Sequence, residues 1–505
     1  MLTRLAPSRR PVVLLWVALM ALLLSGGALA WRVAGHRFRK PVRVLLVAPL
    51  PVNPASGLDA GELRALGAMV QDHLELGGGC AVTAVTELPA TLGPFQNQAK
   101  TLLIQLEPRR EGLNLTLNFR FLRGADIRGN GAPTWSRREF PALPPQEAFR
   151  RFLDAVPAPM EGTTDALVPK NPTVFWALNR ASAWRLQNTH LEEAVSMAEK
   201  AVQSEPTCAS TWLLLGNLRY RTMLNQPRLF REERTEAEAD LNRALALAPS
   251  YPRPAFLLGL IQSDSGNHRE ALELLIRARR AQPGNPTLLT GIAYAARGAG
   301  LLPLSRKAMD LRDALVWKDL QPQAVDITCL YTGEMSRFEA SLQERPGHLT
   351  STSGVLPFYR GYAGLVKGDR ELAQREFRTA AHMANAYPNI QRLSEIYTLI
   401  LEAQAKEAWA KLREYDQERI GMWEPDGELT LRLAEAYALL GDRASAMEMV
   451  GRAFARGFGC TDWYERSPML SPLRVLPKWH AFMQHVRERQ KLMEARFPVE
   501  LLDGN

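Results

Sequence analysis

The second part of the sequence contains a recurring spacing of alanine and proline. An alanine stands five residues before a proline three times: Ala201 and Pro206, Ala244 and Pro249, Ala278 and Pro283. The last two prolines are 34 residues apart. A repeat of this length is one supersecondary unit that buries its apolar face only by stacking on its neighbours. We therefore expect an array of repeats and not a fold around one central core.

Small residues predict how each unit packs. In four units the first predicted helix carries a small residue and the second an alanine: Gly216 with Ala237, Gly259 with Ala271, Gly361 with Ala373, and Ala434 with Ala446. Small side chains at facing positions let two antiparallel helices approach closely. Gly-Asn or Gly-Asp pairs stand at 266–267, 368–369 and 441–442. A left-handed glycine followed by a capping side chain is typical of a tight turn between helices.

The period and these residues resemble the tetratricopeptide repeat (TPR) family, whose pattern begins W-x2-L-G and continues A-x3-F. Residues 212–216 (WLLLG) match the first part and residues 373–377 (AQREF) the second. The resemblance implies TPR-like repeats over 173–319 and 354–460. Clear units are expected at 175–208, 209–251, 252–285, 354–387 and 427–460, and degenerate units at 286–319 and 388–426.

Two segments depart from the period. Pro206 and Pro249 are 43 residues apart, and we expect the excess at residues 224–233, as a loop between the helices of the second unit. Residues 320–353 match no repeat and are expected to be irregular, apart from a short helix near 335–343.

In TPR arrays the first helices of the hairpins line a concave groove that holds a peptide, so the resemblance implies a protein or peptide partner. The groove positions carried over to this chain are Trp176, Asn179, Asn217, Tyr220, Arg253, Phe256, Phe358 and Tyr362. Aromatic residues at helical spacing are also typical of a core, and that alternative stays open. Only Asn217 and Arg253 stand where the family's clamp for chaperone tails needs polar side chains.

Before the repeats, residues 41–157 predict a small α+β domain. Apolar runs at 42–46 and 81–85 indicate strands, and a helical spacing of apolar residues covers 58–76, ended by three glycines. A hairpin is expected from 102–106 and 113–121, turning at 110–112, and a closing helix from 146–156. This order of elements is similar to the small N-terminal domain of TolB-like and FlgO-like bacterial envelope proteins. The proline-rich residues 158–172 predict a linker.

The N-terminus carries the prediction of location. After a basic segment at 1–10, residues 11–34 are expected to form a single transmembrane anchor, since about 20 apolar residues span a bilayer. The alternative is a signal peptide cleaved after Ala28-Leu29-Ala30. We expect a single-pass protein of the inner membrane with its body in the periplasm. Basic residues also follow the apolar run, which favours the alternative of a cytoplasm-facing scaffold that recruits signalling enzymes.

The C-terminal residues 461–505 are expected to form capping helices. Residues 467–483 resemble the tail that ends repeat arrays in bacterial kinase, cyclase and winged-helix signalling proteins. The matching positions are Pro468, Leu470, Pro472, Leu473, Arg474 and Pro477, whereas Ser467 and Trp479 depart from the pattern. The resemblance implies that the tail covers the exposed end of the array.

No motif for catalysis, phosphate binding or a metal is present, the eight histidines are dispersed, and the four cysteines are far apart. The net charge of +9 is mixed with acidic residues, so no nucleic-acid face is expected. The prediction is a binding protein without cofactor and not an enzyme. A remote alternative is an enzyme that uses Asp72, His73 and Glu75, which share one helix but lack a nucleophile. The predicted fold class is α+β, mainly α, with one N-terminal transmembrane helix, the small α+β domain and an α-solenoid of TPR-like hairpins.

Overall fold

The computed structural model describes residues 41–48, 54–127, 134–158, 164–226, 229–317, 320, 325–343, 354–384, 386–421 and 426–503. The apolar residues 11–34 lie outside these ranges, so the anchor stays a prediction. Across the ranges that are described, no helix has both the length and the apolar character to cross a membrane.

The N-terminal domain is built on a five-stranded sheet of order β2-β1-β3-β4-β5. Its strands are β1 (Val42–Val47), β2 (Cys80–Val85), β3 (Thr101–Glu111), β4 (Asn114–Arg123) and β5 (Ser136–Arg138). β1 pairs in parallel with β2 and β3, and the remaining pairs are antiparallel. The predicted strands are confirmed, and β5 is an addition. The hairpin turns later than predicted, at residues 112–113, because Glu111 pairs with Asn114 and Gly112 takes a positive φ of 63°.

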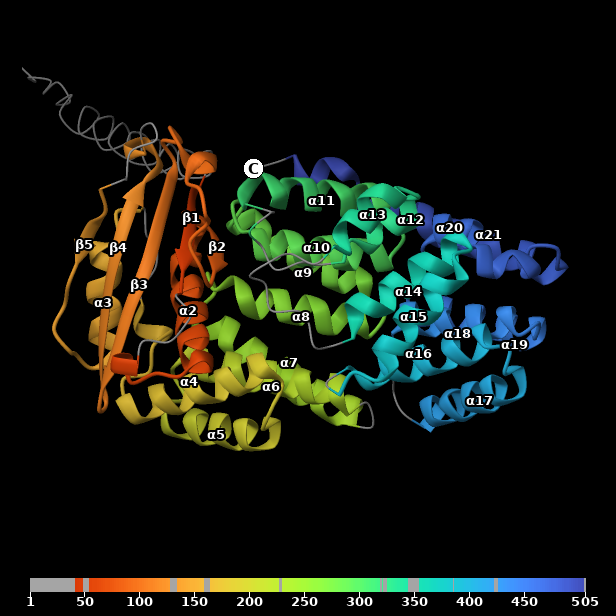
Figure 1. Cartoon of the computed structure of the whole chain (residues 1–505), viewed down its shortest axis with the longest axis horizontal. Helices are drawn as coiled ribbons and strands as arrows, with labels where there is room; N and C mark the ends of the chain where they lie inside the picture. The colour runs from red at the N-terminus through yellow and green to blue at the C-terminus, as the bar shows by residue number, and fades with distance from the viewer. Residues whose placement is uncertain are drawn as a thin grey trace, which may run out of the picture.

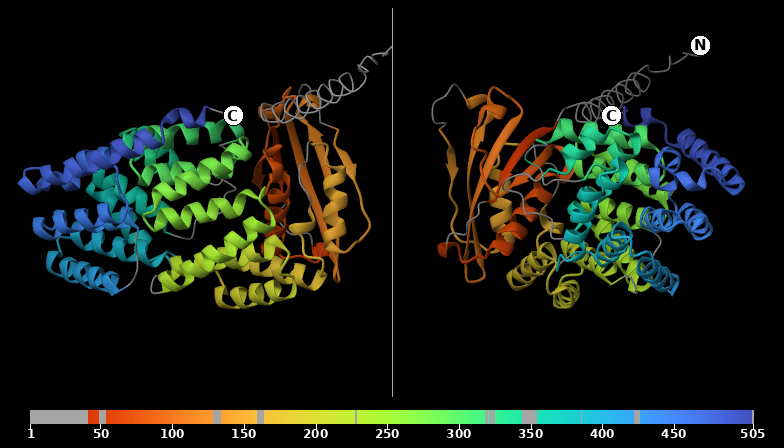
Figure 2. Two further views of the ribbon diagram at one scale, coloured as in Figure 1. Left: turned by 180° about the vertical axis from the view of Figure 1, so that it is seen from behind. Right: turned by 45° about the vertical axis from the view of Figure 1, so that its right-hand side comes forward.

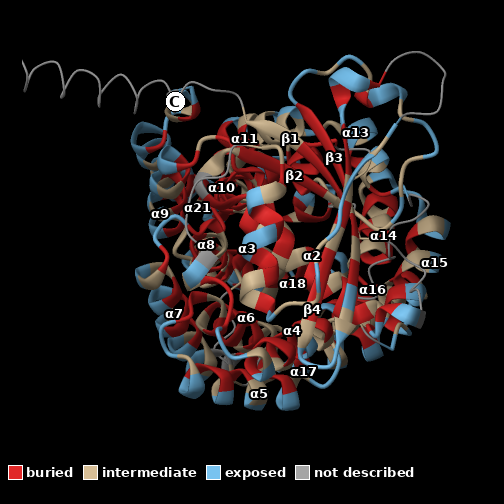
Figure 3. Ribbon diagram, turned by 90° about the vertical axis from the view of Figure 1, so that its left-hand side faces the viewer, coloured by how far each residue is buried: buried red, intermediate tan, exposed pale blue. Residues whose placement is uncertain are grey.

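Two helices cover one face of this sheet: α2 (Ala60–Leu74) and α3 (Pro145–Ala155) (Figure 3). Leu66 and Val70 of α2 and Phe149 of α3 are completely buried against it. α2 begins in a capping box, in which Asp59 accepts from the Glu62 backbone N–H and Glu62 accepts from that of Asp59. The start of α2 is therefore encoded locally.

After the sheet domain, helical hairpins follow one another along the chain (Figure 1). The first four are α4 (Pro172–Gln187) with α5 (Leu191–Ser204), α6 (Ala209–Asn225) with α7 (Phe230–Leu247), α8 (Pro252–Asp264) with α9 (His268–Ala281), and α10 (Pro286–Gly298) with α11 (Leu302–Leu315). The later ones are α14 (Val355–Lys367) with α15 (Arg370–Ala381), α16 (Pro388–Leu401) with α17 (Ala405–Gly421), and α18 (Gly427–Leu439) with α19 (Arg443–Ala455). The predicted α-solenoid of helical hairpins is confirmed, and a hairpin stands at each of the two degenerate units.

In the first segment that departs from the period, helices replace most of the expected loop; in the second, the short helix expected near 335–343 is confirmed and a further helix precedes it. The extra residues of the second unit extend α6 and α7, so only residues 226–229 separate the two helices. Residues 320–353 contain a short hairpin of α12 (Ile327–Thr332) and α13 (Met335–Ser341). Cys329, Tyr331 and Phe338 bury this hairpin in the core of the later repeats. Of these two helices only α13 was predicted, because α12 is too short for a helical spacing of apolar residues to stand out in the sequence.

The predicted turns between helices, each a left-handed glycine followed by a capping side chain, are confirmed in part. Gly266, Gly368 and Gly441 have φ values of 79°, 78° and 81°, as left-handed caps require. The side chains of Asp369 and Asp442 then cap α15 and α19. The expected third cap, Asn267, makes no side-chain hydrogen bond to α9 and donates instead to Gln262.

The predicted linker packs against the array where it is described. Leu167 and Val168 are buried, and the Ser210 hydroxyl of α6 donates to the Leu167 carbonyl. Residues 164–171 therefore do not behave as a free spacer, because their apolar side chains have a surface to cover.

The C-terminal tail comprises α20 (Thr461–Arg466), the 3-10 segment η8 (Pro468–Leu473), α21 (Pro477–Arg496) and η9 (Val499–Leu502). Leu470 and Leu473 are completely buried in the core of the later repeats, as a cap requires. The end of the tail also returns to the earlier repeats, as the adjacent blue and green segments of Figure 2 show. Phe497 and Leu502 join the core around α9 to α11, and Arg279 donates to the Leu502 carbonyl.

Ala271→Leu is expected to lower the free energy of unfolding by about 1 to 3 kcal/mol, because it overfills a closely packed hairpin. Ala271 is completely buried, and a Cβ added at the facing Gly259 would lie 2.6 Å from Leu275 Cδ1. Urea denaturation of the full chain measures the change. Ala281→Leu, at an exposed position of the same helix, is the matched control. Equal midpoints for both variants and the wild type would contradict the close helix packing.

Candidate functional site at the junction of the small domain and the repeat array

The small domain docks onto the array through α2, which lies against α4 and the start of α8 (Figure 1). The Asp72 carboxylate of α2 accepts three hydrogen bonds from α8 and the residue before it. Arg253 donates to Oδ1 through Nε (2.9 Å) and Nη2 (2.6 Å), and the Tyr251 hydroxyl donates to Oδ2 at 2.8 Å. Asp72 raises the pKa of Arg253 further above its usual range. Both oxygens of the carboxylate are thus engaged.

A second set of contacts joins the start of α2 and the β3–β4 turn to α4. Asn179 donates to the Glu62 carbonyl at 3.2 Å, and Arg180 lies 3.4 Å from the Glu62 carboxylate. The Trp176 indole donates to the Leu113 carbonyl at 3.0 Å, while the Arg110 guanidinium lies 4.4 Å from the centre of its ring. The first repeat therefore recognises the domain through side chains of one helix.

A third set of contacts lies at the other end of α2. The Glu75 carboxylate accepts from Asn285 (3.5 Å) and Thr287 (3.4 Å) at the start of α10. Burial raises the pKa of Glu75 to about 7. Trp317, which follows α11, packs on the other face of the sheet, with Phe95 5.0 Å and the Arg43 guanidinium 4.2 Å from its ring.

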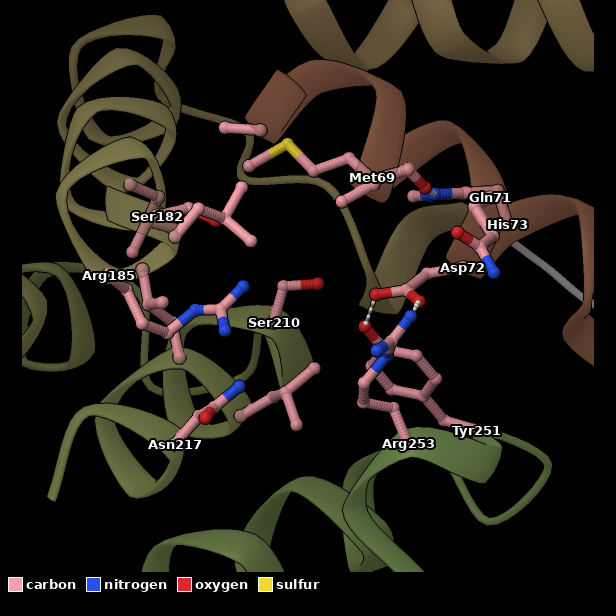
Figure 4. A pocket seen from close by; sticks show the side chains of 16 residues that line it. Met69, Gln71, Asp72, His73, Ser182, Arg185, Ser210, Asn217, Tyr251 and Arg253 are labelled. Atoms are coloured by element: carbon pink, nitrogen blue, oxygen red, sulfur yellow. Dashed lines mark hydrogen bonds and ion pairs between the residues drawn. The ribbon is translucent and has the colours of Figure 1, made fainter. Parts of the chain in front are cut away.

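A cavity of about 260 Å³ lies between α2, α4, α6 and the start of α8 (Figure 4). Its walls are largely apolar, with Met69 from α2, Leu178 from α4 and Leu213 from α6. Asp72 is the only carboxylate among the described residues that line it. The lining cations are Arg253, which pairs with Asp72, and Arg185.

The Arg185 side chain makes no hydrogen bond or ion pair with any residue that the structure describes, and its Nε is buried without a partner. Burial lowers the pKa of Arg185 to about 9, with further contributions from the positive charges of Arg221 and Arg253. The Ser182 and Asn217 side chains, which also line the cavity, likewise lack a hydrogen-bond partner within the described ranges. The Nε2 atom of His73, which lines the cavity from α2, is also buried without a partner. The cavity therefore presents one unneutralised guanidinium and three polar groups that a ligand can use.

The eight predicted groove residues do not line one groove in the described part of the chain. Asn217 and Arg253 line the cavity, and Trp176 and Asn179 contact the small domain. The Tyr220 hydroxyl donates to Asp264 at 2.7 Å.

The other three predicted groove residues also belong to the interior. Phe256 is half-buried and packs against two apolar cores. Phe358 and Tyr362 are completely buried in the later repeats, and the Tyr362 hydroxyl donates to Glu435 at 2.6 Å. For these two the expected surface position is wrong, because the later hairpins and the tail close over them.

The three titratable residues of the enzyme alternative point to different partners. Asp72 binds α8 and Glu75 binds α10, as described above. The His73 ring packs 4.9 Å from Phe149, with Nδ1 2.6 Å from the Met69 carbonyl. They do not converge on one point. No group of three or more His, Cys, Asp or Glu side chains that could hold a metal occurs in the described ranges.

Sequence reasoning missed Arg185 and the role of Asp72. A usable indication was present, because Leu178, Ser182 and Arg185 follow the i, i+4, i+7 spacing of one helix face. A charged residue on the buried stripe of a helix is uncommon and points to a partner or a ligand. Nothing in the sequence indicated that Asp72 faces Arg253.

A second polar cluster joins the two halves of the array. Arg297 lies 2.9 Å from Glu428, and Asp264 accepts from Tyr220 and Tyr294. Burial raises the pKa of Asp264 to about 6 and that of Asp426 to about 7. Of these contacts the Arg297–Glu428 pair joins the two halves, whereas Tyr220, Asp264 and Tyr294 all belong to the earlier half. The space beside the pair is too small for a ligand, about 10 Å³.

Comparisons with known proteins add little. No family model matches the sequence, and no curated protein matches it. Among solved structures, the TPR domain of P58(IPK) aligns with 64% of this chain and 99% of its own length, at 13% identity and a TM-score of 0.18. At that TM-score the likeness carries no argument, so the TPR-like description rests on the hairpins themselves.

Glu75→Gln is expected to weaken the pH dependence of stability. The pKa of Glu75 is about 7 in the folded chain against an ordinary 4.5, so the folded state retains a proton that the unfolded state releases. The stability from this proton is complete below the ordinary pKa and is lost as the pH rises through about 7. At about pH 8 the variant should gain on the order of 2 kcal/mol over the wild type, with little difference near pH 4.5.

Urea denaturation at the two pH values measures this effect. Glu232→Gln, an exposed carboxylate on α7, is the control and should leave the pH dependence unchanged. Buried Asp264 and Asp426 titrate in the same direction, so a reduced slope is expected and not a flat profile. The same difference between Glu75→Gln and the wild type at both pH values would show that Glu75 is not the titrating group.

Proposed function

We propose that this chain is a membrane-anchored adaptor or sensor of the bacterial envelope, whose helical array binds a protein partner. One observation carries the proposal: the first helices α4, α8 and α10 already hold a folded domain through matched side-chain contacts. A surface of paired charges, buried aromatic rings and backbone acceptors is the kind that protein interfaces use. The array is therefore proposed to recognise proteins, and no catalytic role is proposed.

The partner is proposed to bind the exposed side of the array, because the small domain covers the inner side of the early repeats. Trp409 of α17 is 38% exposed and Leu439 of α18 is 39% exposed, although both are large apolar residues. The Trp409 indole lies 3.4 Å from Asp442, which follows Leu439 closely in the chain. Exposed aromatic residues are frequent anchors of protein interfaces.

The location is proposed from the sequence alone: one N-terminal span in the inner membrane, with the body in the periplasm. The cytoplasm-facing alternative draws on the basic residues after the apolar run, of which Arg43 is one. The Arg43 guanidinium lies over the Trp317 ring and donates to the Val316 carbonyl. Its charge therefore takes part in the contact between the small domain and the array. That observation supports the proposed periplasmic orientation.

The full chain is expected to stay with membranes after an alkaline wash and to need detergent for release, because residues 11–34 are long enough to span the bilayer. Intact-mass measurement should find the N-terminus retained. A chain that begins at Trp31 would instead establish a cleaved signal peptide. Protease added to intact spheroplasts should digest the body, whereas protection of the body would place it in the cytoplasm. The same chain without residues 11–34 is the control.

A photo-crosslinking amino acid at Trp409 or Leu439 is expected to capture one discrete protein in living cells. The same substitution at Leu113, 50% exposed on the β3–β4 turn, is the matched control and should capture nothing. With the captured protein purified, Trp409→Ala should weaken binding by about 2 kcal/mol if Trp409 is an interface anchor. Absence of a product from both array positions would remove the proposed surface, and a product from Leu113 alone would move it to the small domain.

A further inference from the structure

The cavity between α2, α4, α6 and the start of α8 has the composition of a binding site for a small anion. Residues of the small domain form one side of it, and residues of the first three repeats form the other. Most of its wall is apolar, and the described polar groups on it that lack a partner are Arg185, Ser182 and Asn217 of the array and His73 Nε2 of α2 (Figure 4). Small-molecule sites combine these two features: an apolar body and a few polar groups that fix orientation.

The charges around the cavity do not balance. Asp72 is the only lining carboxylate that the structure describes, and its oxygens already accept from Arg253 and Tyr251. Arg185 therefore faces the cavity without a counter-ion, and Arg221 and Arg253 add repulsion. Arg185 is partly buried, and its Nε is enclosed without a partner, so an anion that reaches this guanidinium supplies a counter-charge where water screens it incompletely.

The polar groups of the cavity that lack a partner indicate which kind of anion it can bind. A guanidinium matches the planar carboxylate group and can donate two parallel hydrogen bonds to it. One unpaired cation neutralises a monoanion, and the nearby Asp72 disfavours a ligand with two negative charges. The Ser182 hydroxyl and Asn217 amide can donate to the remaining lone pairs. The apolar wall requires a hydrocarbon body.

The size of the cavity limits that body. Its volume of about 260 Å³ is below the range of about 300 to 1,000 Å³ that is usual for drug-sized ligands. We propose that this cavity binds a small organic monocarboxylate with a short apolar chain, with Arg185 as the counter-ion and Ser182 and Asn217 as further donors. The ligand touches both the small domain and the repeats, so its binding strengthens their junction. This site is separate from the partner surface proposed above.

The test is the melting temperature of the purified full chain in detergent, titrated with hexanoate. A ligand that binds the folded state alone raises the melting temperature in a saturable way. Hexanoate should raise it by a few degrees, and hexan-1-ol, which has the same chain without the charge, should not. Arg185→Gln should abolish the response, whereas Arg243→Gln, an exposed arginine on α7, should retain it.

A second variant supplies the missing charge from within the chain. Ser182 and Arg185 are three residues apart on α4 and line the same cavity, so the carboxylate of Ser182→Asp can pair with the guanidinium. This variant should melt above the wild type and lose the response to hexanoate. It keeps the test decisive even where Arg185→Gln fails to fold.

Three results would overturn the proposal: equal shifts from hexanoate and hexan-1-ol, a hexanoate response that survives in Ser182→Asp, or no response of the wild type to hexanoate. If acetyl-leucyl-leucine raises the melting temperature and hexanoate does not, the ligand of the cavity is a peptide C-terminus and not a small organic acid. The titration uses the purified chain alone. Its outcome therefore does not depend on whether the crosslinking experiment captures a partner.

Discussion

The Asp72 carboxylate is the contact on which the arrangement of the two domains depends. It lies on α2 and accepts from Arg253 and Tyr251 at the start of the third repeat, so it ties the sheet domain to the array. Breaking such a pair leaves a charge in a poorly solvated place, which makes the docked position strongly preferred. The same pairing uses both oxygens of the only described carboxylate in the cavity. Arg185 is left unneutralised for that reason, and the proposed anion site follows from the docking.

Long-range polar contacts make the array more compact than a simple solenoid. In an ideal repeat array each unit touches only its neighbours. Here Arg297 of the fourth hairpin pairs with Glu428 of the last, and the tail returns from the later repeats to Arg279. Deep inside the later half, Arg432 lies 3.0 Å from Glu435, with both side chains almost wholly buried. These contacts join repeats that are far apart in the sequence.

The elements that could be predicted are those with a local cause. The strand of residues 42–47 is a short apolar run, the helix after Asp59 begins in a capping box, and each confirmed left-handed turn needs its glycine. Helix α12 and the extension of α6 and α7 were not predictable in this way. Residues 327–341 are stabilised by burial in the later core, and burial has no local signature.

The same distinction between local and long-range causes applies to the candidate site. By itself the sequence determined the hairpins, their close packing at small residues and the order of elements in the sheet domain, because helical and strand periodicities act over a few neighbouring residues. Only the tertiary structure decided that Asp72 meets Arg253, 181 residues away, and that Phe358 and Tyr362 lie in a core and not in a groove. The role of a charged or aromatic side chain depends on the residues that contact it. Those contacts are set by the docking of whole domains, which no short stretch of sequence encodes.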